Sequence, residues 1–319
     1  MSYSGRIKEE LAREIPKSRH CCIAELAAVI SLCGNVHFDE YDRVRIEIHT
    51  ENAAAARKYF TLLKKTFNIS SDLSFRQGFG SRKTAMCILT VDDDDAAARD
   101  VLKACRLIRD FNEIGEDMAL TDKLLLKRDC CRRAFIRGAF LASGSINDPQ
   151  GKYHFEIVCH TPEKAEQISG LMRSFDISAR VTKRRNSYIV YVKDGSSVAD
   201  LLRCMGAYTA LMDMENIRIM KDMRNQVNRQ VNCETANINK TVAAAMRQID
   251  DINYLKESHI FDELPDHLKE AAQLRVRFPE ASLAELGSML KDPVGRSGVN
   301  HRLKKISALA DEHRVKYFQ

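Results

Sequence analysis

Two nine-residue segments of this chain repeat one helical pattern, and they constrain its fold more than any other feature. Residues 26–34 read LAAVISLCG, and residues 136–144, about 110 positions later, read IRGAFLASG. Each copy ends at a glycine, Gly34 or Gly144. Small residues recur one helical turn apart at matching places, so two helix backbones can pack closely there: Ala24, Ala28, Ala134 and Gly138. The repeat therefore predicts two equivalent helices packed at the centre of a duplicated unit.

Each copy is followed by a similar order of periodic patterns. After the first copy come an alternating run, an amphipathic helix, two strand-like runs and a closing helix, over 44–48, 53–67, 73–76, 85–89 and 95–108. After the second copy the order recurs over 153–159, 162–175, 179–182, 188–192 and 198–205. The bridge 111–128 is expected to be helical. The fold class is α+β, a duplicated αββαββα unit whose two sheets form a saddle beneath the paired helices.

The paired segments resemble the LAGLIDADG helices of homing endonucleases. In that family the residue before the last glycine is an acid that holds a catalytic Mg²⁺ at the DNA backbone. Here the two positions are Cys33 and Ser143. A thiol and a hydroxyl are poor ligands for a hard cation, and the acids Asp39 and Asp148 are expected beyond the helix ends. The resemblance implies a LAGLIDADG-like, DNA-binding saddle that has lost its nuclease centre, and no enzymatic activity.

Composition excludes several other classes of protein. With 319 residues and an apolar fraction of 45%, the chain can form more than one core. It has neither an apolar run of membrane-spanning length nor a signal-peptide-like start, so a cytoplasmic, nucleoid-associated protein without membrane contact is expected. The ten cysteines include no C-x-x-C pair, and the pairs 21–22, 130–131 and 159–160 lack zinc-ligand spacing. The acidic run 92–95 fits a helix start. Reduced thiols, no metal and no cofactor are expected.

Basic residues gather in four places along the chain, within 127–137, 180–185, 218–229 and from 296 onward. A net charge of +6 and a pI near 8.7 are compatible with nucleic acid. Several basic residues lie on or beside the strands expected to line the saddle, and these are candidate contacts to the DNA backbone: Arg76, Arg82, Lys83, Lys183, Arg184 and Arg185. A groove lined with one sign of charge is expected to bind with a steep salt dependence.

The last third of the chain changes to helical patterns. Two amphipathic helices, 213–230 and 238–255, predict an all-α connecting region, followed by an acidic linker at 257–264. Three short helices are expected beyond residue 265, the second opening with a capping box at 282–285 and the third with Ser297 as its N-cap. Val299, Leu303 and Ile306 mark the core face of the third helix. Its other face is the candidate DNA-binding site: Ser297, Asn300, His301, Arg302, Lys304 and Lys305.

A short helix, a break and a polar-basic helix are the arrangement of a helix-turn-helix, whose last helix enters the major groove of double-stranded DNA. The alternative is a helical cap with a solvated outer face. The predicted domains are therefore a first repeat at 1–125, a second at 126–210, the connecting region at 211–256, the linker at 257–264 and the helix-turn-helix domain at 265–319.

A degenerate LAGLIDADG pair followed by a helix-turn-helix resembles the WhiA family of bacterial proteins. The segments that carry the resemblance are 137–145 (RGAFLASGS), 237–241 (NINKT) and 297–303 (SGVNHRL). It implies a sequence-specific DNA-binding transcriptional regulator tied to cell division, chromosome segregation and, in spore formers, sporulation. Two alternatives stay open. One is a platform for a protein partner in transcription or division, or for a ligand; the other is an active endonuclease or maturase.

Overall fold

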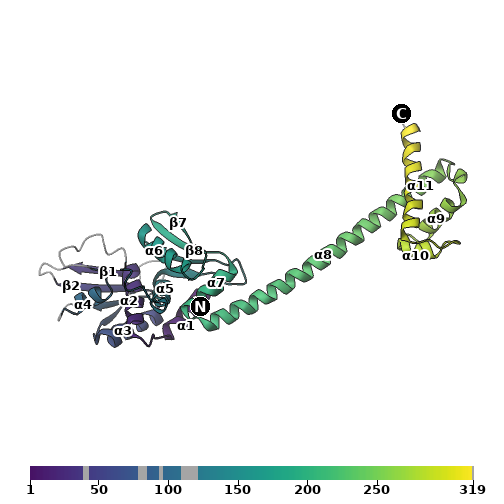
Figure 1. The fold of residues 1–319 in the computed structure, drawn as a ribbon. Helices are drawn as coiled ribbons and strands as arrows, with labels where there is room; N and C mark the ends of the chain where they lie inside the picture. Colours follow the sequence, from purple (N-terminus) through teal and green to yellow (C-terminus); the bar gives the residue numbers. More distant parts are fainter. Residues whose placement is uncertain (39–42, 78–84, 93–95, 109–120, 318–319) are drawn as a thin grey trace. The chain divides into compact units, whose positions relative to one another are not determined.

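The structure is a computed structural model, and it describes residues 1–38, 43–77, 85–92, 96–108 and 121–317. The chain divides into two compact units, Met1–Lys221 and Asp222–Gln319, which are described separately below. Figure 1 shows the elements of each. Among the described residues, no helix combines the length and the apolar character needed to cross a lipid bilayer.

The first unit contains the predicted duplication. Its first copy consists of α2 (Arg19–Cys33), β1 (Gly34–Phe38), β2 (Val44–Thr50), α3 (Ala53–Phe67), β3 (Asp72–Gln77), β4 (Ala85–Val91) and α4 (Ala97–Ala104). Its second copy consists of α5 (Asp129–Ser143), β5 (Gly144–Ile146), β6 (Phe155–Cys159), α6 (Pro162–Arg173), β7 (Arg180–Arg184), β8 (Ser187–Val192) and α7 (Gly195–Met205). The order αββαββα thus occurs twice, which confirms the predicted fold class.

The two sheets have the same topology. Their strand orders are β1-β2-β4-β3 and β5-β6-β8-β7, and every neighbouring pair is antiparallel. In β2 and β6 alternate residues are buried, as expected for strands that pack one face on helices. We call the face of each sheet that points away from the helices its outer face.

Helices α2 and α5 lie side by side at the centre of this unit (Figure 1). Ala24, Ala28, Ala134 and Gly138 are all buried. A Cβ atom on Gly138 would lie only 2.5 Å from the carbonyl oxygen of Glu25. The small residues therefore permit the close helix packing that the repeat predicts.

The terminal glycines are needed because the chain turns directly from helix into strand. β1 begins at Gly34 and β5 at Gly144. A Cβ atom on Gly144 would lie 2.7 Å from the carbonyl oxygen of Phe140, and one on Gly34 would lie 2.5 Å from that of Ile30. Because these contacts are with backbone atoms, a larger residue would force the turn to move.

Two parts of the first unit differ from the sequence-based expectation. An unpredicted helix, α1 (Tyr3–Arg13), buries Tyr3, Ile7 and Leu11 in the core; these residues recur every four positions, as in an amphipathic helix. The bridge 111–128 was expected to be helical. Its residues 111–120 lie outside the described part of the chain, and its residues 121–128 form turns rather than a helix.

The connecting region is one helix rather than a bundle of two. α8 runs from Tyr208 to Glu257, and the division between the two units falls within it. The second unit also contains the 3-10 turn η2 (Phe261–Glu263), α9 (Asp266–Arg277), α10 (Leu283–Ser288) and α11 (Arg296–Tyr317). The region between the two predicted helices contains no proline or glycine, so nothing in it requires a break.

The segment 257–264, expected to be a linker, is part of the second core. Phe261 and Leu264 are buried together with Ile252 and Leu255 from α8. The acidic residues of this segment and the proline that follows it suggested solvent exposure, but its apolar side chains determine its position. Ser297 also differs from its predicted role, because α11 already begins at Arg296 and the amide of Val299 donates to the carbonyl oxygen of Gly295.

Candidate nucleic-acid interface

The turns of the helix-turn-helix are held by hydrogen bonds that backbone amides donate. The amide of Glu285 donates to Ser282 Oγ (3.3 Å), and the amide of Ser282 donates to Glu285 Oε2 (2.7 Å), forming the predicted capping box at the start of α10. The amide of Val294 donates to the carbonyl oxygen of Gly287. A Cβ atom on Gly287 would lie 2.1 Å from the Val294 carbonyl oxygen. Glycine therefore lets the turn approach α10 closely before α11 begins.

A buried arginine closes the preceding loop. Arg275 in α9 is 3% exposed, and its Nη1 donates to the carbonyl oxygens of Pro279 (3.2 Å) and Ala281 (2.8 Å). Burial lowers the pKa of this guanidinium. Its hydrogen bonds connect α9 to the loop that enters α10. The three helices form one packed unit because they share one core.

The two faces of α11 have the character that the sequence predicts. Val299, Leu303 and Ile306 are each 1% exposed and lie in the second core. The six candidate DNA-binding residues lie on the rest of the helix near its start. Ser297, His301, Lys304 and Lys305 are exposed, whereas Asn300 and Arg302 are half-buried at the edges. The structure thus brings all six to one surface, with the half-buried pair at its margins.

A hollow of about 540 Å³ borders this surface. It lies within the second unit, between α8, α10 and the first turn of α11, and Asn300 and Arg296 line its side on α11. Lys240 and Thr241 line it from α8. Both belong to the segment 237–241, one of the three that carry the family resemblance. Sequence periodicity alone did not connect that segment to the candidate interface, because more than fifty positions separate it from α11.

In the first unit, Cys33 and Ser143, at the two helix positions where the LAGLIDADG resemblance expects an acid, have side chains that bond internally. Cys33 Sγ donates to the Val29 carbonyl oxygen within its own helix (3.2 Å), and Ser143 Oγ donates to the Val158 carbonyl oxygen on β6 (2.8 Å). Burial raises the pKa of the Cys33 thiol to about 12. Asp148 is exposed in the loop after β5, and Asp39 lies outside the described residues.

The six residues proposed to contact the DNA backbone from the saddle do not lie on one surface. Asp72 of β3 and Arg180 of β7 occupy equivalent register positions in the two sheets. Arg76 and Arg184, each four residues further on, are therefore also equivalent, and both are exposed on the outer faces.

The other four candidates differ from this pair. Lys183 alternates with Arg184 and so lies on the opposite side of β7, where its Nζ is 5.7 Å from the centre of the Tyr188 ring. Arg185 is exposed in the two-residue turn between β7 and β8, with φ 55°. Arg82 and Lys83 lie outside the described part of the chain.

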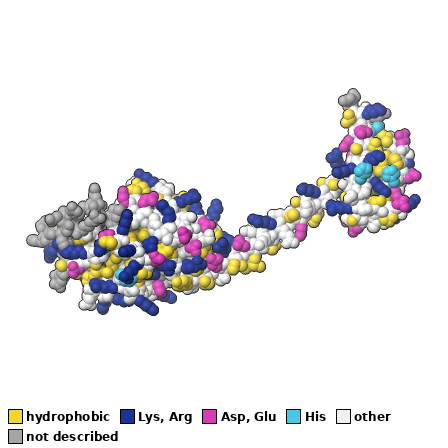
Figure 2. All heavy atoms as spheres, in the orientation of Figure 1, with side chains coloured by type: hydrophobic (Ala, Val, Ile, Leu, Met, Phe, Trp, Pro, Cys, Tyr) yellow, Lys and Arg dark blue, Asp and Glu magenta, His cyan; other side chains and the backbone are white. Residues whose placement is uncertain are grey.

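The outer faces carry acids as well as bases, which corrects the expectation of a groove with a single sign of charge. Glu47 Oε2 lies 3.1 Å from His49 Nε2 on the first sheet. At the equivalent place on the second sheet, Glu156 Oε2 lies 3.1 Å from His154 Nε2, and Ser145 Oγ donates to Glu156 Oε1. Figure 2 shows that acidic side chains also lie among basic ones on the face of the first unit that is drawn there.

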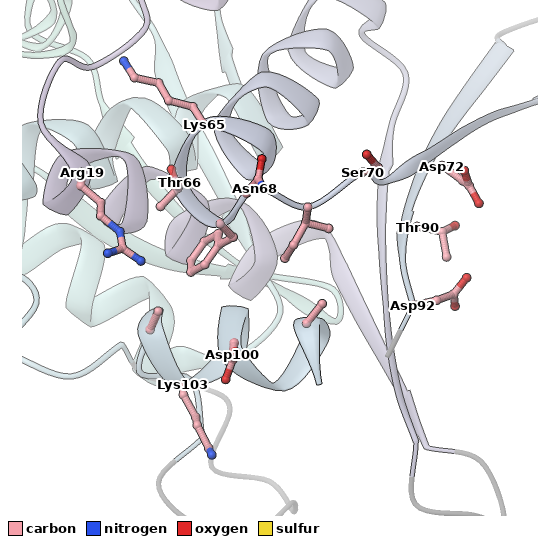
Figure 3. Close-up of a pocket in the computed structure, with 14 residues that line it drawn as sticks. Arg19, Lys65, Thr66, Asn68, Ser70, Asp72, Thr90, Asp92, Asp100 and Lys103 are labelled. Atoms are coloured by element: carbon pink, nitrogen blue, oxygen red, sulfur yellow. The ribbon is translucent and has the colours of Figure 1, made fainter. Parts of the chain in front are cut away.

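A larger hollow in the first unit does not select one kind of ligand. Its volume is about 1180 Å³ and it lies near the ends of α3 and α4 (Figure 3). The charged side chains that line it are Arg19, Lys65, Lys103, Asp72, Asp92 and Asp100. Basic and acidic groups are equally represented, so neither an anion nor a cation is favoured.

Two side-chain clusters in the first unit were missed by sequence reasoning. Glu25 on α2 is fully buried, with its Oε1 2.5 Å from Lys58 Nζ and its Oε2 2.9 Å from Arg137 Nη2. Burial lowers the pKa of Lys58. The second cluster consists of His20, Cys21, Cys130 and Cys131; aligning the two repeats position by position would have placed Cys130 and Cys131 opposite the first pair.

Comparison with known proteins finds matches for most of this architecture. Three family models match: the WhiA N-terminal LAGLIDADG-like domain at 19–108, the WhiA LAGLIDADG-like domain at 132–224 and the WhiA C-terminal HTH domain at 227–310. A probable cell division protein WhiA of Lachnoclostridium phytofermentans is 46% identical over 98% of this chain and 99% of its own length. A protein of the same name from Alkaliphilus metalliredigens is 43% identical over 99% of each chain.

Among solved structures, full-length DUF199/WhiA from Thermatoga maritima matches with a TM-score of 0.59 and 26% identity. The match covers 98% of this chain and 99% of that one. Similarity therefore extends through both the duplicated unit and the helix-turn-helix unit.

Proposed function

The chain belongs to the WhiA family, and from that membership we propose that it is a sequence-specific, non-cleaving regulator of transcription that binds double-stranded DNA. Its curated relatives are named probable cell division proteins. We accordingly place its action in bacterial cell division, in the cytoplasm and on the nucleoid. Chromosome segregation and sporulation are further processes in which this regulation would act.

The observation that carries the proposal is the exposed polar face of α11. Its apolar face is fixed in the core by Val299, Leu303 and Ile306, so the orientation of the helix is determined. Asn300 and His301 can donate to and accept from base edges, and lysines suit guanine edges and phosphates. Genome-wide immunoprecipitation of the wild-type protein should yield a recurrent DNA motif. A variant with this face removed should lose that motif.

The proposed absence of DNA cleavage follows from the two helix ends. Cys33 and Ser143 replace the acids that would hold a metal ion at the scissile phosphate, and both bond to backbone carbonyls. Plasmid DNA incubated with the purified protein and Mg²⁺ or Mn²⁺ should remain supercoiled, as it does without protein. Site-specific nicking that disappears in Ser143→Ala would contradict this prediction.

We also propose that the first unit contacts the DNA backbone through Arg76 and Arg184. The double variant Arg76→Ala/Arg184→Ala should bind all DNA sequences more weakly and should flatten the dependence of log K on log salt by about 0.9 per lost phosphate contact. Lys183→Ala is the matched control, because Lys183 lies on the other side of β7. Equal salt slopes for the double variant and the wild type would show that this surface does not touch DNA.

A second candidate function for the first unit is binding of a protein partner. The observation in its favour is the pair of carboxylates, Glu47 and Glu156, at equivalent places on the outer faces, because acids repel phosphates. A partner recovered with the full-length protein after DNase treatment, and lost in Glu47→Ala/Glu156→Ala, would support this function. Recovery that depends on intact DNA would exclude it.

A further inference from the structure

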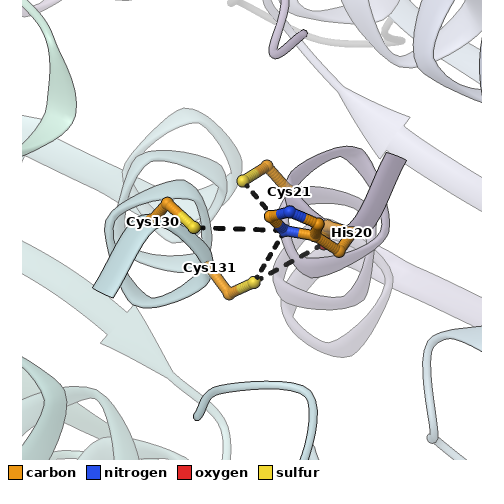
Figure 4. Close-up of side chains that lie close together, drawn as sticks. All are labelled: His20, Cys21, Cys130 and Cys131. Atoms are coloured by element: carbon orange, nitrogen blue, oxygen red, sulfur yellow. Dashed lines mark hydrogen bonds between the residues drawn. The ribbon is translucent and has the colours of Figure 1, made fainter. Parts of the chain in front are cut away.

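Four side chains with nitrogen or sulfur ligand atoms converge where the first turns of α2 and α5 meet (Figure 4). His20 Nδ1 lies 3.2 Å from Cys131 Sγ, 3.3 Å from Cys21 Sγ and 4.0 Å from Cys130 Sγ. One ligand atom from each of the four residues lies within 4.8 Å of the others. We propose that His20, Cys21, Cys130 and Cys131 bind one Zn²⁺ ion, which connects the two halves of the duplicated unit.

The internal repeat explains why these residues meet. The offset that relates Gly34 to Gly144 also relates His20 to Cys130 and Cys21 to Cys131. Because α2 and α5 pack against each other, equivalent positions in their first turns face one another. Each repeat therefore supplies two adjacent ligands, and the site is complete only when both repeats are folded together.

The set of ligands fits zinc better than it fits a hard cation. Three thiolates and one imidazole form a known type of structural zinc site, with Zn–S bonds of about 2.3 Å and Zn–N bonds of about 2.0 Å. In a tetrahedron with those bonds the ligand atoms are about 3.5–3.8 Å apart. The distances from His20 Nδ1 lie on either side of that range, so small side-chain movements would complete the geometry.

The helix N-termini offset part of the cost of forming thiolates here, because burial by itself raises the pKa of Cys21 and Cys131. Cys21, Cys130 and Cys131 lie in the first turns of their helices, where the helix dipole and unpaired amides stabilise negative charge. Neither Ser18 nor Arg128, the two N-cap residues, makes a side-chain capping bond. No side-chain cap therefore competes for the first-turn amides, of which those of Cys21 and Cys131 donate to the carbonyl oxygens of Ser18 and Arg128.

Binding of Zn²⁺ requires the three thiols to lose their protons. Burial, followed by a hydrogen bond with Cys130, raises the pKa of Cys21 to about 12 when no metal is bound. Zn²⁺ would displace the three thiol protons to solvent, since coordination favours the thiolate. Coordination through Nδ1 leaves the imidazole proton on Nε2. Arg128, exposed and 3.4 Å from Nε2, would then turn away and would still offset the net negative charge of the site.

An ion can reach these four ligands from solvent, and the site is separate from the other end of the two helices. Cys130 is exposed, whereas Cys21 and Cys131 are 8% and 2% exposed, so an ion can enter from the side of Cys130. Cys22 does not belong to the set, because its Sγ donates to the Pro16 carbonyl oxygen. The site lies at the opposite ends of α2 and α5 from Cys33 and Ser143, and it is therefore separate from the lost nuclease centre.

The test uses the full-length protein, purified under reducing conditions, incubated with Zn²⁺ and desalted. Elemental analysis should find one zinc per chain, and Co²⁺ in its place should produce the thiolate charge-transfer absorption of a tetrahedral site. Cys130→Ser should lose that absorption and should release zinc to a chelator at least about tenfold more readily. Cys233→Ser, which changes an exposed cysteine of the second unit, should behave as the wild type.

A second measurement separates zinc binding from folding. The chelator should lower the thermal midpoint of the wild type and of Cys233→Ser by more than that of Cys130→Ser, whose exposed position permits folding. Equal zinc content in the wild type and in Cys130→Ser/Cys131→Ser would identify an adventitious ion only and would overturn the proposal. A Cys21–Cys131 or Cys21–Cys130 disulfide that persists in reductant when Zn²⁺ is present would overturn it as well.

Discussion

Asn300→Ala/His301→Ala/Lys304→Ala is expected to lower the affinity for the operator by about 10³-fold or more, to the level of unrelated DNA. Each residue that reads a base contributes about 1–3 kcal/mol of discrimination. The three residues are neighbours on one helix, so their individual contributions need not add. Titration of operator and scrambled duplexes at one fixed salt concentration measures the loss.

A second variant separates base recognition from contacts to phosphates. Arg302→Ala/Lys305→Ala should weaken binding to both duplexes by similar factors and should reduce the salt dependence. All five substitutions leave the core residues of α11 unchanged, so the helical circular dichroism should be retained. Wild-type affinity of the triple variant for the operator would locate recognition elsewhere, with the outer faces of the first unit as the next candidate.

Glu25→Ala should lower the free energy of unfolding of the first unit by about 3–5 kcal/mol, the range for removing one partner of a buried ion pair. Glu25 contacts both Lys58 and Arg137, and no part of its side chain is exposed. Without the carboxylate, two cations remain in the core. Lys58 retains only the Leu11 carbonyl oxygen and Arg137 only that of Met205 among the partners described for them.

Two controls test whether the uncompensated charge is the cause. Glu25→Ala/Lys58→Met removes one of the two cations as well and should recover part of the lost stability. Glu166→Ala removes the acid of the exposed pair with Arg173, and it should change the free energy of unfolding by less than about 1 kcal/mol. Denaturant unfolding followed by circular dichroism gives all three values. Similar losses for Glu25→Ala and Glu166→Ala would show that burial of the Glu25 network does not matter.

Much of the architecture could be predicted because it depends on local patterns. The repeat at 26–34 and 136–144 indicated the two central helices, and their small residues indicated close packing. Spacings of four and three placed Val299, Leu303 and Ile306 in the core and left the polar face of α11 exposed. The capping box at 282–285 could also be predicted from a local pattern, because its hydrogen bonds join residues three positions apart.

Expectations based on composition were less successful. The acidic segment 257–264 resembled a linker, but Phe261 and Leu264 are buried, because two apolar side chains in contact with a core outweigh several solvated charges. The outer faces of the sheets were expected to be basic, yet Glu47 and Glu156 lie there. Strand alternation also separates Lys183 from Arg184, a distinction that a count of basic residues does not make.

The sequence by itself determined the duplicated elements, the presence of Cys33 and Ser143 rather than acids before the two glycines, and the two faces of α11. Periodicity and residue identity are local properties of the chain, and they are sufficient for these features. Only the tertiary structure decided which distant side chains meet. Glu25 contacts Arg137, and His20 approaches Cys131, across about 110 residues of chain. These contacts exist because α2 and α5 pack together, and such packing depends on the whole core.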